Sequence, residues 1–316
     1  MKYKTFSEAV EVYLKERRSM GYSLERRGEQ LCNFAKYADK IGHKGPLTTE
    51  LALQWVRLPQ KCQVNYWAQR LSTIRVFAKY MKLLDPKTQI PPKGLFGTYY
   101  HRPIPHIYSK EEITIIIKAA RKLTPVTGLY PHTYVTLFGL LLCSGIRIFE
   151  ALKLSRDDID FNSGILTVIE GKFKRSRLVP LHSTALKPLK SYIKKVDKKF
   201  PIPQTKAFFV NERGKRLGYN SAWRIFHQII LNRIWNKKTN GSIPRIYDLR
   251  HTFATCRLLE WHRNGDDVAK KINQLSTYMG HVSIQDTYWY LSAIPELMDI
   301  IGTRFEKFVN RKEVVS

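Results

Sequence analysis

The sequence contains few acidic residues for its length. Its 316 residues include 26 aspartates and glutamates against 54 lysines and arginines, which gives a formal net charge of +28 at pH 7 and an isoelectric point near 10.0. This excess favours a polyanionic partner, and we expect nucleic acid rather than an anionic membrane surface. With 43% hydrophobic and 12% aromatic residues, the composition excludes a disordered, fibrous or low-complexity protein.

The chain also lacks a hydrophobic run long enough to cross a membrane. Its longest apolar stretches, such as Tyr134 to Cys143, are shorter than the roughly 18 residues that a membrane span requires. The amino-terminal residues contain no apolar stretch followed by a cleavage site of small residues, so secretion is not expected. We therefore expect a soluble, cytoplasmic protein with no membrane partner.

Paired cysteines and a nucleotide-binding loop are missing as well. The four cysteines, Cys32, Cys62, Cys143 and Cys256, form no C-x-x-C pair, so we interpret them as reduced core residues and expect neither a disulfide framework nor a zinc site. Gly164 and Gly171 are separated by six residues, whereas a P-loop requires about four, and Phe173 replaces its Ser or Thr. The sequence thus predicts no metal and no bound nucleotide.

The length predicts more than one domain. At 316 residues and 37.0 kDa, the chain exceeds the roughly 100 to 200 residues of a usual single domain. Apolar residues recur at helical spacing through the first part of the chain, and the Pro- and Gly-rich stretch from Pro91 to Pro105 cannot continue a helix. We predict a helical domain over 1–95, a linker over 96–107, a second domain over 108–292 and a helical tail over 293–316.

One β region interrupts the helical pattern of the second domain. Apolar runs at Ile159–Phe161, Ile165–Ile169 and Leu178–Leu181 are separated by turns, which is typical of a three-stranded antiparallel meander. Helices are expected on both sides of it, including one that starts at Ser144. The predicted fold is therefore mainly α with a small antiparallel β-sheet, an α+β fold.

Basic side chains occupy outward positions of the helical domain. Arg70, Arg75 and Lys79 belong to this set, and we predict that they contact nucleic-acid phosphates. A merely solvated basic face is the alternative interpretation if this domain is considered alone.

The first candidate for chemistry is Arg147 in the segment Ser144-Gly-Ile-Arg-Ile-Phe-Glu150. We expect Ser144 to cap a helix whose first turn carries Arg147, where free N–H groups and the helix dipole favour an anion. The guanidinium adds a bidentate fork suited to phosphate, and Glu150 can hold it in place. An ordinary surface pair at i, i+3 is the alternative.

The second candidate is a cationic hairpin turn between the second and third strands. Lys172 lies in this turn, where a lysine can reach into a groove and donate a proton to a leaving oxygen. Lys174, Arg175 and Arg177 follow, and we predict that they contact DNA. A solvated turn is the alternative.

Two further segments carry candidate residues near the carboxyl end. Asp248 is a plausible helix cap, which places Tyr247 and Arg250 at a helix entrance where both can meet an anion. Gly280 ends a helix, and Ser283 and Asp286 form a capping box for the next one, which carries Tyr288 and Tyr290. His281 lies between these helices; a structural histidine and core tyrosines are the alternatives.

These segments, in this order, resemble the tyrosine recombinase family, the phage integrases and their relatives. The family's catalytic domain carries an arginine in a T/S-G-x-R-x-x-E helix, a lysine in a G-K-x-x-K-x-R β-turn, an H-x-x-R-H helix and a G-H turn. Its tyrosine follows the last histidine as Tyr290 follows His281 here, nine residues on, which selects Tyr290 over Tyr288. The resemblance covers Ser109 to Leu291, and the helical domain is similar in layout to a core-binding domain. It implies a catalytic set of Arg147, Lys172, Tyr247, Arg250, His281 and Tyr290.

One residue departs from the family pattern. Tyr247 stands where the family has a histidine before its second arginine. A phenol can hydrogen-bond a phosphate oxygen, but it carries no positive charge and is a poorer general base near neutral pH. We assign Tyr247 a phosphate-binding role, and His251 is the neighbouring side chain able to compensate.

The resemblance implies a site-specific DNA recombinase of the integrase or transposase type. Tyr290 would attack a phosphodiester, giving a 3′-phosphotyrosine and releasing a 5′-hydroxyl, with Lys172 as proton donor to the leaving oxygen. Cationic side chains would neutralise the charge that develops at phosphorus. No metal and no cofactor are then required.

The implied partners are double-stranded DNA and further copies of the chain. In residues 293–316, Ile294, Leu297, Ile301, Phe305 and Phe308 trace one apolar helical face. Such a helix can pack on its own core or dock on a neighbouring subunit, and the family's habit of exchanging it within a tetramer favours the second arrangement.

Two other classes of function stay open at this point. Asp157, Asp158 and Asp160 suggest a metal-dependent nuclease, although acids that flank a strand are typical turn and cap residues. A DNA-binding protein without catalysis would keep the positive charge with a decayed site. Type IB topoisomerases share the chemistry, but the small helical domain and apolar tail suit recombination better.

Overall fold

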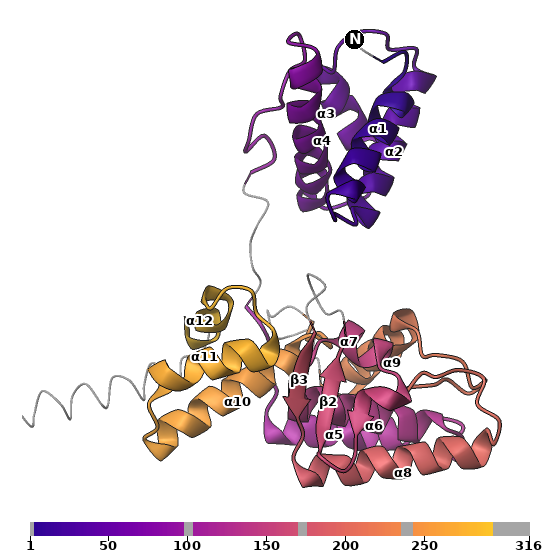
Figure 1. Ribbon diagram of the computed structural model, residues 1–316, viewed down its shortest axis with the longest axis vertical. Helices are drawn as coiled ribbons and strands as arrows, with labels where there is room; N and C mark the ends of the chain where they lie inside the picture. The colour runs from indigo at the N-terminus through magenta and orange to yellow at the C-terminus, as the bar shows by residue number, and fades with distance from the viewer. Residues whose placement is uncertain (1–2, 98–103, 170–175, 235–242, 293–316) are drawn as a thin grey trace, which may run out of the picture. The chain divides into compact units, whose positions relative to one another are not determined.

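The computed structural model divides the chain into two compact units, Met1–Pro103 and Ile104–Ser316 (Figure 1). It describes residues 3–97, 104–169, 176–234 and 243–292, with only the backbone of 289–292. The division lies within the stretch for which the sequence predicts a linker. Among the described residues, no helix combines the length and the apolar character needed to span a bilayer.

The described part of the first unit is a helical bundle, as the spacing of its apolar residues predicts. Threonines cap two of its helices: Thr5 accepts a hydrogen bond from the Glu8 amide, and Thr48 accepts one from the Leu51 amide. The core is rich in aromatic contacts, with the Phe34 ring edge-on to both Phe6 and Trp55. The helices are α1 (Phe6–Ser19), α2 (Glu25–Lys40), α3 (Thr49–Arg57) and α4 (Val64–Leu84).

Arg70 does not lie on the outward face of α4, so this sequence prediction is wrong. Its side chain is buried, its guanidinium carbon lies 3.5 Å from the centroid of the Trp55 ring, and its Nη2 donates to the Trp55 carbonyl oxygen at 2.7 Å. Burial lowers the pKa of Arg70 below its usual value. The guanidinium covers an aromatic face while satisfying a backbone acceptor, which a helical pattern alone does not reveal.

The other two basic positions predicted on α4 differ in their surroundings. Arg75 is half-buried and donates to the carbonyl oxygens of Pro91 and Pro92, each at 2.8 Å. It therefore holds the end of this unit against α4. Lys79 is exposed, so it lies on the surface as the sequence predicts.

The second unit is mainly helical with one small sheet, which confirms the predicted fold class. Its strands β1 (Ile159–Asp160), β2 (Ile165–Val168) and β3 (Arg177–Pro180) pair in the order β1-β2-β3, and both pairs are antiparallel. The predicted meander is thus confirmed. The helices are α5 (Lys110–Arg121), α6 (Tyr130–Ser144), α7 (Ile148–Lys153), α8 (Ser183–Lys199), α9 (Tyr219–Arg233), α10 (Asp248–Asn264), α11 (Val268–Met279) and α12 (Gln285–Ser292), with a 3₁₀ turn at Arg156–Asp158.

Helix α6 is the centre of the second unit. It packs against α5, α8 and α10, and its side chains are buried on most sides, as expected for a helix that is apolar all round. The sheet adds Leu166, Val168 and Val179 to the same core. Within this unit α8 runs along the lower side in Figure 1, whereas α7 and α9 lie toward the upper side.

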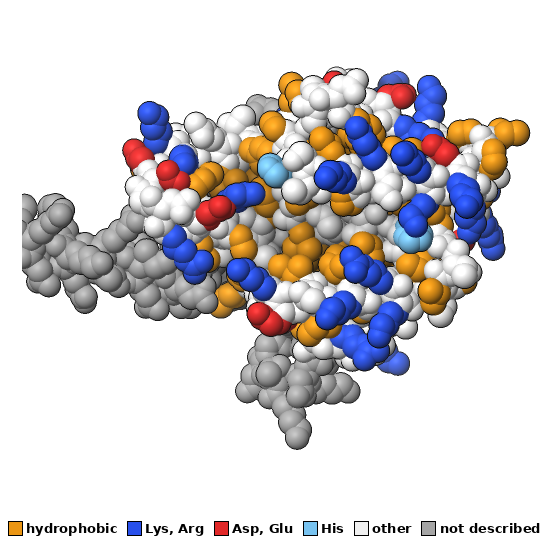
Figure 2. All heavy atoms as spheres, turned by 90° about the horizontal axis from the view of Figure 1, so that it is seen from below, with side chains coloured by type: hydrophobic (Ala, Val, Ile, Leu, Met, Phe, Trp, Pro, Cys, Tyr) orange, Lys and Arg blue, Asp and Glu red, His pale blue; other side chains and the backbone are white. Residues whose placement is uncertain are grey.

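Positive charge is spread widely over the lower face of the second unit. Seen from below, Lys and Arg side chains are spread over the surface and far outnumber Asp and Glu (Figure 2). Helix α8 alone exposes Lys187, Lys190, Lys194, Lys195, Lys198 and Lys199. Net charge therefore does not locate a binding face, and a site has to be found from the geometry of particular side chains.

The predicted start of the Arg147 helix at Ser144 needs correction. Helix α6 continues through Ser144, whose Oγ donates to the Leu140 carbonyl at 2.6 Å, and Arg147 is itself the N-cap of α7. Ser144 therefore does not cap the Arg147 helix, because Gly145 in the left-handed region ends α6 first.

The cysteines are not core residues. Cys32, Cys143 and Cys256 are exposed, and Cys62 is half-buried.

Gly145 tests how tightly the junction between α6 and α7 is built. It adopts φ +61°, and a Cβ there would lie 2.3 Å from Cδ1 of the Phe253 ring. We expect Gly145→Ala to lower the free energy of unfolding by roughly 2 to 4 kcal/mol, from left-handed strain and overpacking. Gly139→Ala in α6 is the control, since nothing lies within 4 Å of its Cβ position. Urea unfolding of both variants checks this, and equal stabilities would contradict it.

Candidate active site

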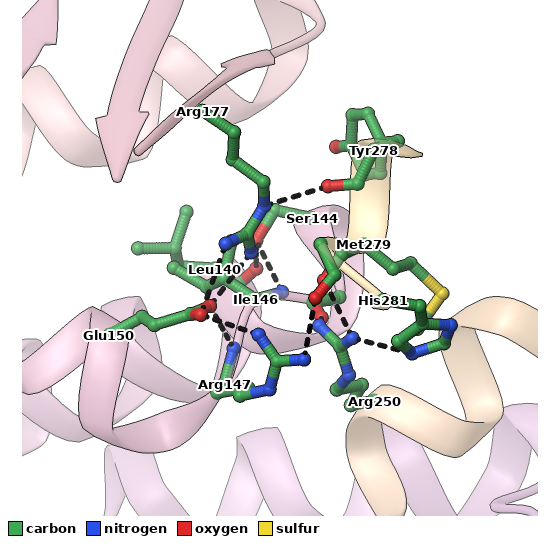
Figure 3. A network of polar contacts seen from close by, with 12 residues as sticks. Leu140, Ser144, Ile146, Arg147, Glu150, Arg177, Arg250, Tyr278, Met279 and His281 are labelled. Atoms are coloured by element: carbon green, nitrogen blue, oxygen red, sulfur yellow. Dashed lines mark hydrogen bonds and ion pairs between the residues drawn. The ribbon is translucent and has the colours of Figure 1, made fainter. Parts of the chain in front are cut away.

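Three arginines converge on three consecutive carbonyl groups at the end of α11. Gly280 adopts a left-handed conformation after Met279 and ends this helix, which leaves the last carbonyl oxygens without partners inside it. Arg177 donates to Tyr278 at 2.9 Å, Arg250 to Met279 at 2.7 Å and Arg147 to Gly280 at 2.9 Å. Figure 3 shows the three guanidinium groups around this turn, which we call the α11 turn (residues 278–280). The negative end of the helix dipole stabilises their positive charge.

Arg147 is fixed by Glu150 as well as by the α11 turn. The Glu150 carboxylate accepts the Arg147 amide at 2.9 Å through Oε2 and the Arg147 Nη1 at 2.7 Å through Oε1. The predicted i, i+3 pair is therefore present, but it is buried rather than an ordinary surface pair. These contacts and the bond to Gly280 use two of the five N–H donors of the guanidinium. As far as the described residues go, donors remain to bind an anion.

Arg250 is almost completely buried, with 1% of its surface exposed. Its Nη1 donates to the Gly145 carbonyl at 2.5 Å, and its Nη2 lies 2.9 Å from His281 Nε2. The sequence places it at the entrance of α10, and the structure agrees, except that Tyr247 is the N-cap and Asp248 the first helical residue. The Asp248 carboxylate instead accepts the Arg245 amide at 2.8 Å.

Arg177, which the sequence predicts to contact DNA, has a largely buried side chain that is bonded within the protein. It begins β3, and each of its three nitrogens donates within the protein: Nε to Tyr278, Nη1 to Glu150 Oε1 at 3.0 Å and Nη2 to Glu150 Oε2 at 2.8 Å. Its side chain is only 12% exposed. Arg177 thus ties the base of the cationic hairpin to α7 and to the α11 turn.

Glu150 joins two of the three arginines and is held in its ionised form. Burial opposes ionisation, but hydrogen bonds from the Arg177 side chain and the Arg147 amide, with the charges of both guanidinium groups, lower the pKa of Glu150 to about 2. An internal carboxylate with two cationic partners offsets part of the charge repulsion between the arginines. It therefore permits several cations to stay close together without DNA.

His281 follows the α11 turn, and both of its ring nitrogens have partners. Nε2 lies 2.9 Å from Arg250 Nη2, and Nδ1 lies 2.6 Å from Thr287 Oγ1 on α12. Its backbone amide also donates to Ser276 at 3.0 Å. The structure therefore brings three of the predicted catalytic residues, Arg147, Arg250 and His281, around one turn.

Tyr247 and His251 lie one helical turn apart at the start of α10. The Tyr247 ring is 39% exposed and packs edge-on to His251, with 5.0 Å between ring centroids. His251 itself is buried beneath it. The Tyr247 phenol is therefore accessible three residues before Arg250, and a compensating role of His251 stays a prediction.

Several predicted residues fall outside the part that the structure describes. Lys172, Lys174 and Arg175 lie outside the described residues, and of Tyr290 only the backbone position in α12 is described. Their roles remain predictions.

The acidic residues near β1 have local structural partners. Asp158 accepts the Ser155 amide at 2.7 Å, and Asp160 accepts the Asn162 amide at 2.8 Å and the Ser163 hydroxyl at 2.7 Å. Among the described residues, no group of three or more His, Cys, Asp or Glu side chains is arranged to hold a metal ion. These carboxylates act as cap and turn residues, so they give no support to a metal-dependent nuclease.

A row of exposed aromatic side chains close to Arg147 is a feature that the sequence analysis missed. Phe149 stacks on Tyr219, with ring centroids 4.5 Å apart, and Trp223 stacks on His227 at 4.8 Å. Phe149 is 57% and Trp223 47% exposed. The spacing of four residues along α9 was the available signal, but only packing of α7 against α9 places Phe149 in the row.

A comparison of the sequence with known protein families agrees with this fold and this cluster of arginines. The model of the phage integrase family matches residues 108–296, and the chain therefore belongs to the phage integrase family, the tyrosine recombinases, which cleave and rejoin DNA strands.

Two relatives illustrate the range of similarity. The chain is 38% identical over 309 residues to y4rB of Sinorhizobium fredii, named as an integrase/recombinase, covering 96% of this chain and 98% of that protein. It is 32% identical over 222 residues to tyrosine recombinase XerC of Chlamydia trachomatis, covering 70% of this chain and 65% of that protein.

Solved structures with the same fold include two DNA-bound enzymes. The Tn1549 transposon integrase in complex with transposon right end DNA has a TM-score of 0.66 at 12% identity, covering 96% of this chain and 99% of that chain. The XerH site-specific recombinase bound to its difH substrate has a TM-score of 0.62 at 18% identity, covering 95% and 85%. At these identities the likeness shows the fold.

Replacing Glu150 tests whether one carboxylate holds the arginine cluster. We expect Glu150→Gln to lower the free energy of unfolding by about 3 kcal/mol at pH 7, because it leaves two buried guanidinium groups short of a negative partner. Glu260→Gln removes an exposed partner of Arg257 and should cost less than about 1 kcal/mol. Urea unfolding at pH 7 compares the two variants.

Glu150→Gln also tests how the free energy of unfolding depends on pH. The Glu150 pKa is about 2 in the folded chain and about 4.3 in an unfolded chain, so its contribution is present above the unfolded value and disappears as the pH falls toward 2. The stability gap between wild type and Glu150→Gln should narrow over that window. A stability difference that stays constant over this pH range would show that the negative charge of Glu150 does not stabilise the arginine cluster.

Proposed function

We propose that this chain is a site-specific DNA recombinase that cuts and rejoins strands of duplex DNA through a covalent bond to Tyr290. The observation that carries the proposal is the gathering of Arg147, Arg250 and His281 around the α11 turn. Fixed N–H donors in a partly buried site suit a phosphodiester, whose negative charge increases as a nucleophile attacks.

The reaction needs a phenol that is mostly protonated at neutral pH to act as nucleophile. With an ordinary pKa of about 10, only about a thousandth of such a side chain is ionised near pH 7, so nearby cations or a base must assist. The Tyr290 oxygen bonds to phosphorus while the bond from phosphorus to the 5′ oxygen breaks, and Lys172 gives a proton to that leaving oxygen. The resulting 3′-phosphotyrosine keeps the bond energy, so a 5′-hydroxyl can reverse the step without a nucleotide.

Duplex DNA is the proposed substrate, and several surfaces suit it. Exposed Lys79 in the first unit and the hairpin residues Lys174 and Arg175 supply charge for phosphates. The aromatic row consists of Phe149 stacked on Tyr219 and Trp223 stacked on His227, and Phe149 lies two residues beyond Arg147. Aromatic and apolar contacts can read thymine methyl groups or pack on sugars, so we assign this row to the DNA interface.

The tail 293–316 is proposed to hold four copies together on DNA. Its apolar helical face needs a partner surface, and the second unit offers a groove of about 400 Å³ whose lining includes Phe253, Trp261, Leu275 and Tyr278. Docking of the tail of one copy in the groove of its neighbour would close a ring of identical contacts.

Removing the tail tests this assembly. We expect the chain truncated after Ser292 to bind DNA that carries one recognition site. It should form no tetramer on DNA that carries two sites, because each interface between copies loses the apolar contacts of the tail. Mass photometry of both proteins with DNA from beside the gene measures this directly. A tetramer formed equally well by the truncated chain would contradict the tail's role.

A nicked suicide substrate tests the reaction itself. We expect wild type to form a protein–DNA adduct that survives boiling in detergent, and Tyr290→Phe to form none, since a ring without a hydroxyl cannot esterify phosphate. Tyr288→Phe, which alters a 45% exposed residue, should behave as wild type. The adduct should also form in EDTA, which separates this enzyme from a metal-dependent nuclease.

The remaining outcomes decide between the alternatives. DNA binding without any adduct in wild type would favour a non-catalytic DNA-binding protein. An adduct that persists in Tyr290→Phe would move the nucleophile to another residue.

A further inference from the structure

The imidazole of His281 is held from both sides, which fixes the position of its proton. Arg250 Nη2 lies 2.9 Å from Nε2, and a guanidinium can only donate. Nε2 must therefore present its lone pair to Arg250. A neutral imidazole then carries its single proton on Nδ1, which donates it to Thr287 Oγ1 at 2.6 Å.

Thr287 is built into the structure at this point. Its residue surface is completely buried, and its amide donates to the Ile284 carbonyl at 2.8 Å in the first turn of α12. Ser283 Oγ accepts the Gln285 amide at 3.3 Å at the start of the same helix. Helix α12 packs against α10 and α11, which carry Arg250 and the α11 turn. The hydroxyl therefore has little freedom to leave His281.

The opposite tautomer would conflict with its surroundings. A proton on Nε2 would face a donor of Arg250, although Nδ1 could then accept a hydrogen bond from the Thr287 hydroxyl. A short contact between two donors in a buried site is unfavourable. Arg250 excludes a proton on Nε2, and Thr287 supplies the buried acceptor that the proton on Nδ1 requires.

We propose that Thr287 is a positioning residue that fixes the tautomer of His281, so that its Nε2 lone pair faces the arginine cluster. This inference rests on the proposed function. The Nε2 lone pair then accepts from Arg250 Nη2, so the neutral ring orients the guanidinium that the proposed function assigns to the phosphate. With Nδ1–H on Thr287, the ring keeps Arg250 in place as negative charge develops on the phosphate.

Thr287 lies between His281 and Tyr290 in the sequence. It lies six residues after His281 and three before Tyr290. The hydrogen bond that sets the histidine tautomer therefore anchors the helix on which the nucleophile is carried.

Nitrogen NMR of isotope-labelled histidine in the full-length chain tests the tautomer without any DNA. We expect His281, identified by its loss in His281→Gln, to be protonated on Nδ1 in wild type and in Thr287→Ser, which keeps the hydroxyl. Thr287→Val has nearly the same shape without the acceptor and should show Nε2–H or a mixture. A wild type protonated on Nε2, or a Thr287→Val spectrum identical to wild type, would overturn the proposal.

A double-mutant cycle with the suicide substrate tests the catalytic consequence. We expect Thr287→Val to slow adduct formation about tenfold or more, by analogy with other residues that orient a functional histidine, while DNA affinity stays unchanged. In a His281→Gln background the same change should have no further effect. Thr277→Val is the matched control, because its exposed hydroxyl bonds only to the Asn273 carbonyl among the described residues. Losses that add in the double variant would show that Thr287 does not act through His281.

The two measurements separate failure of this inference from failure of the proposed function. If wild type forms no adduct, the recombinase proposal fails, and the NMR result still decides the tautomer. If wild type forms the adduct but Thr287→Val reacts equally fast, the role of Thr287 fails alone.

Discussion

The C-terminal end of α11 is the constraint on which the site depends. A helix must leave its last carbonyl groups unpaired, and here Tyr278, Met279 and Gly280 offer theirs to three different arginines. Those arginines come from β3, α10 and the start of α7, segments that are far apart in the sequence. One short turn therefore brings together three cations from distant parts of the sequence.

Keeping three guanidinium groups together without a substrate requires compensation, and the protein supplies it in two ways. Glu150 provides a full negative charge shared between Arg147 and Arg177, and the backbone carbonyls provide partial charges that cost no additional side chain. The donors of Arg147 and Arg250 are thus oriented before DNA arrives. Preorganisation of this kind is what allows electrostatic stabilisation to act at the moment of reaction without rearrangement.

The sequence predicted much of the fold and the identities of the central residues. Helical spacing and turn residues were sufficient for the bundle and the meander, and motif order was sufficient to select Arg147, Arg250 and His281. It failed where a side chain's role depends on a distant partner. Arg177 lies next to a cationic segment in the sequence, but its hydrogen-bond partner Glu150 comes from another element. Arg70 fits the pattern of an outward-facing residue, but its guanidinium is buried and donates to the Trp55 carbonyl oxygen. The sequence gives no sign that Thr287 differs from other helical threonines, because its contact with His281 depends on how the fold places the two side chains.

A crystal structure of the chain with DNA from beside its own gene tests the central claim most directly. The account predicts the scissile phosphate within about 3 Å of donors from both Arg147 and Arg250, with the carbonyls of the α11 turn still bound to the same three arginines. A phosphate held elsewhere, or an α11 turn that releases the arginines when DNA binds, would contradict it.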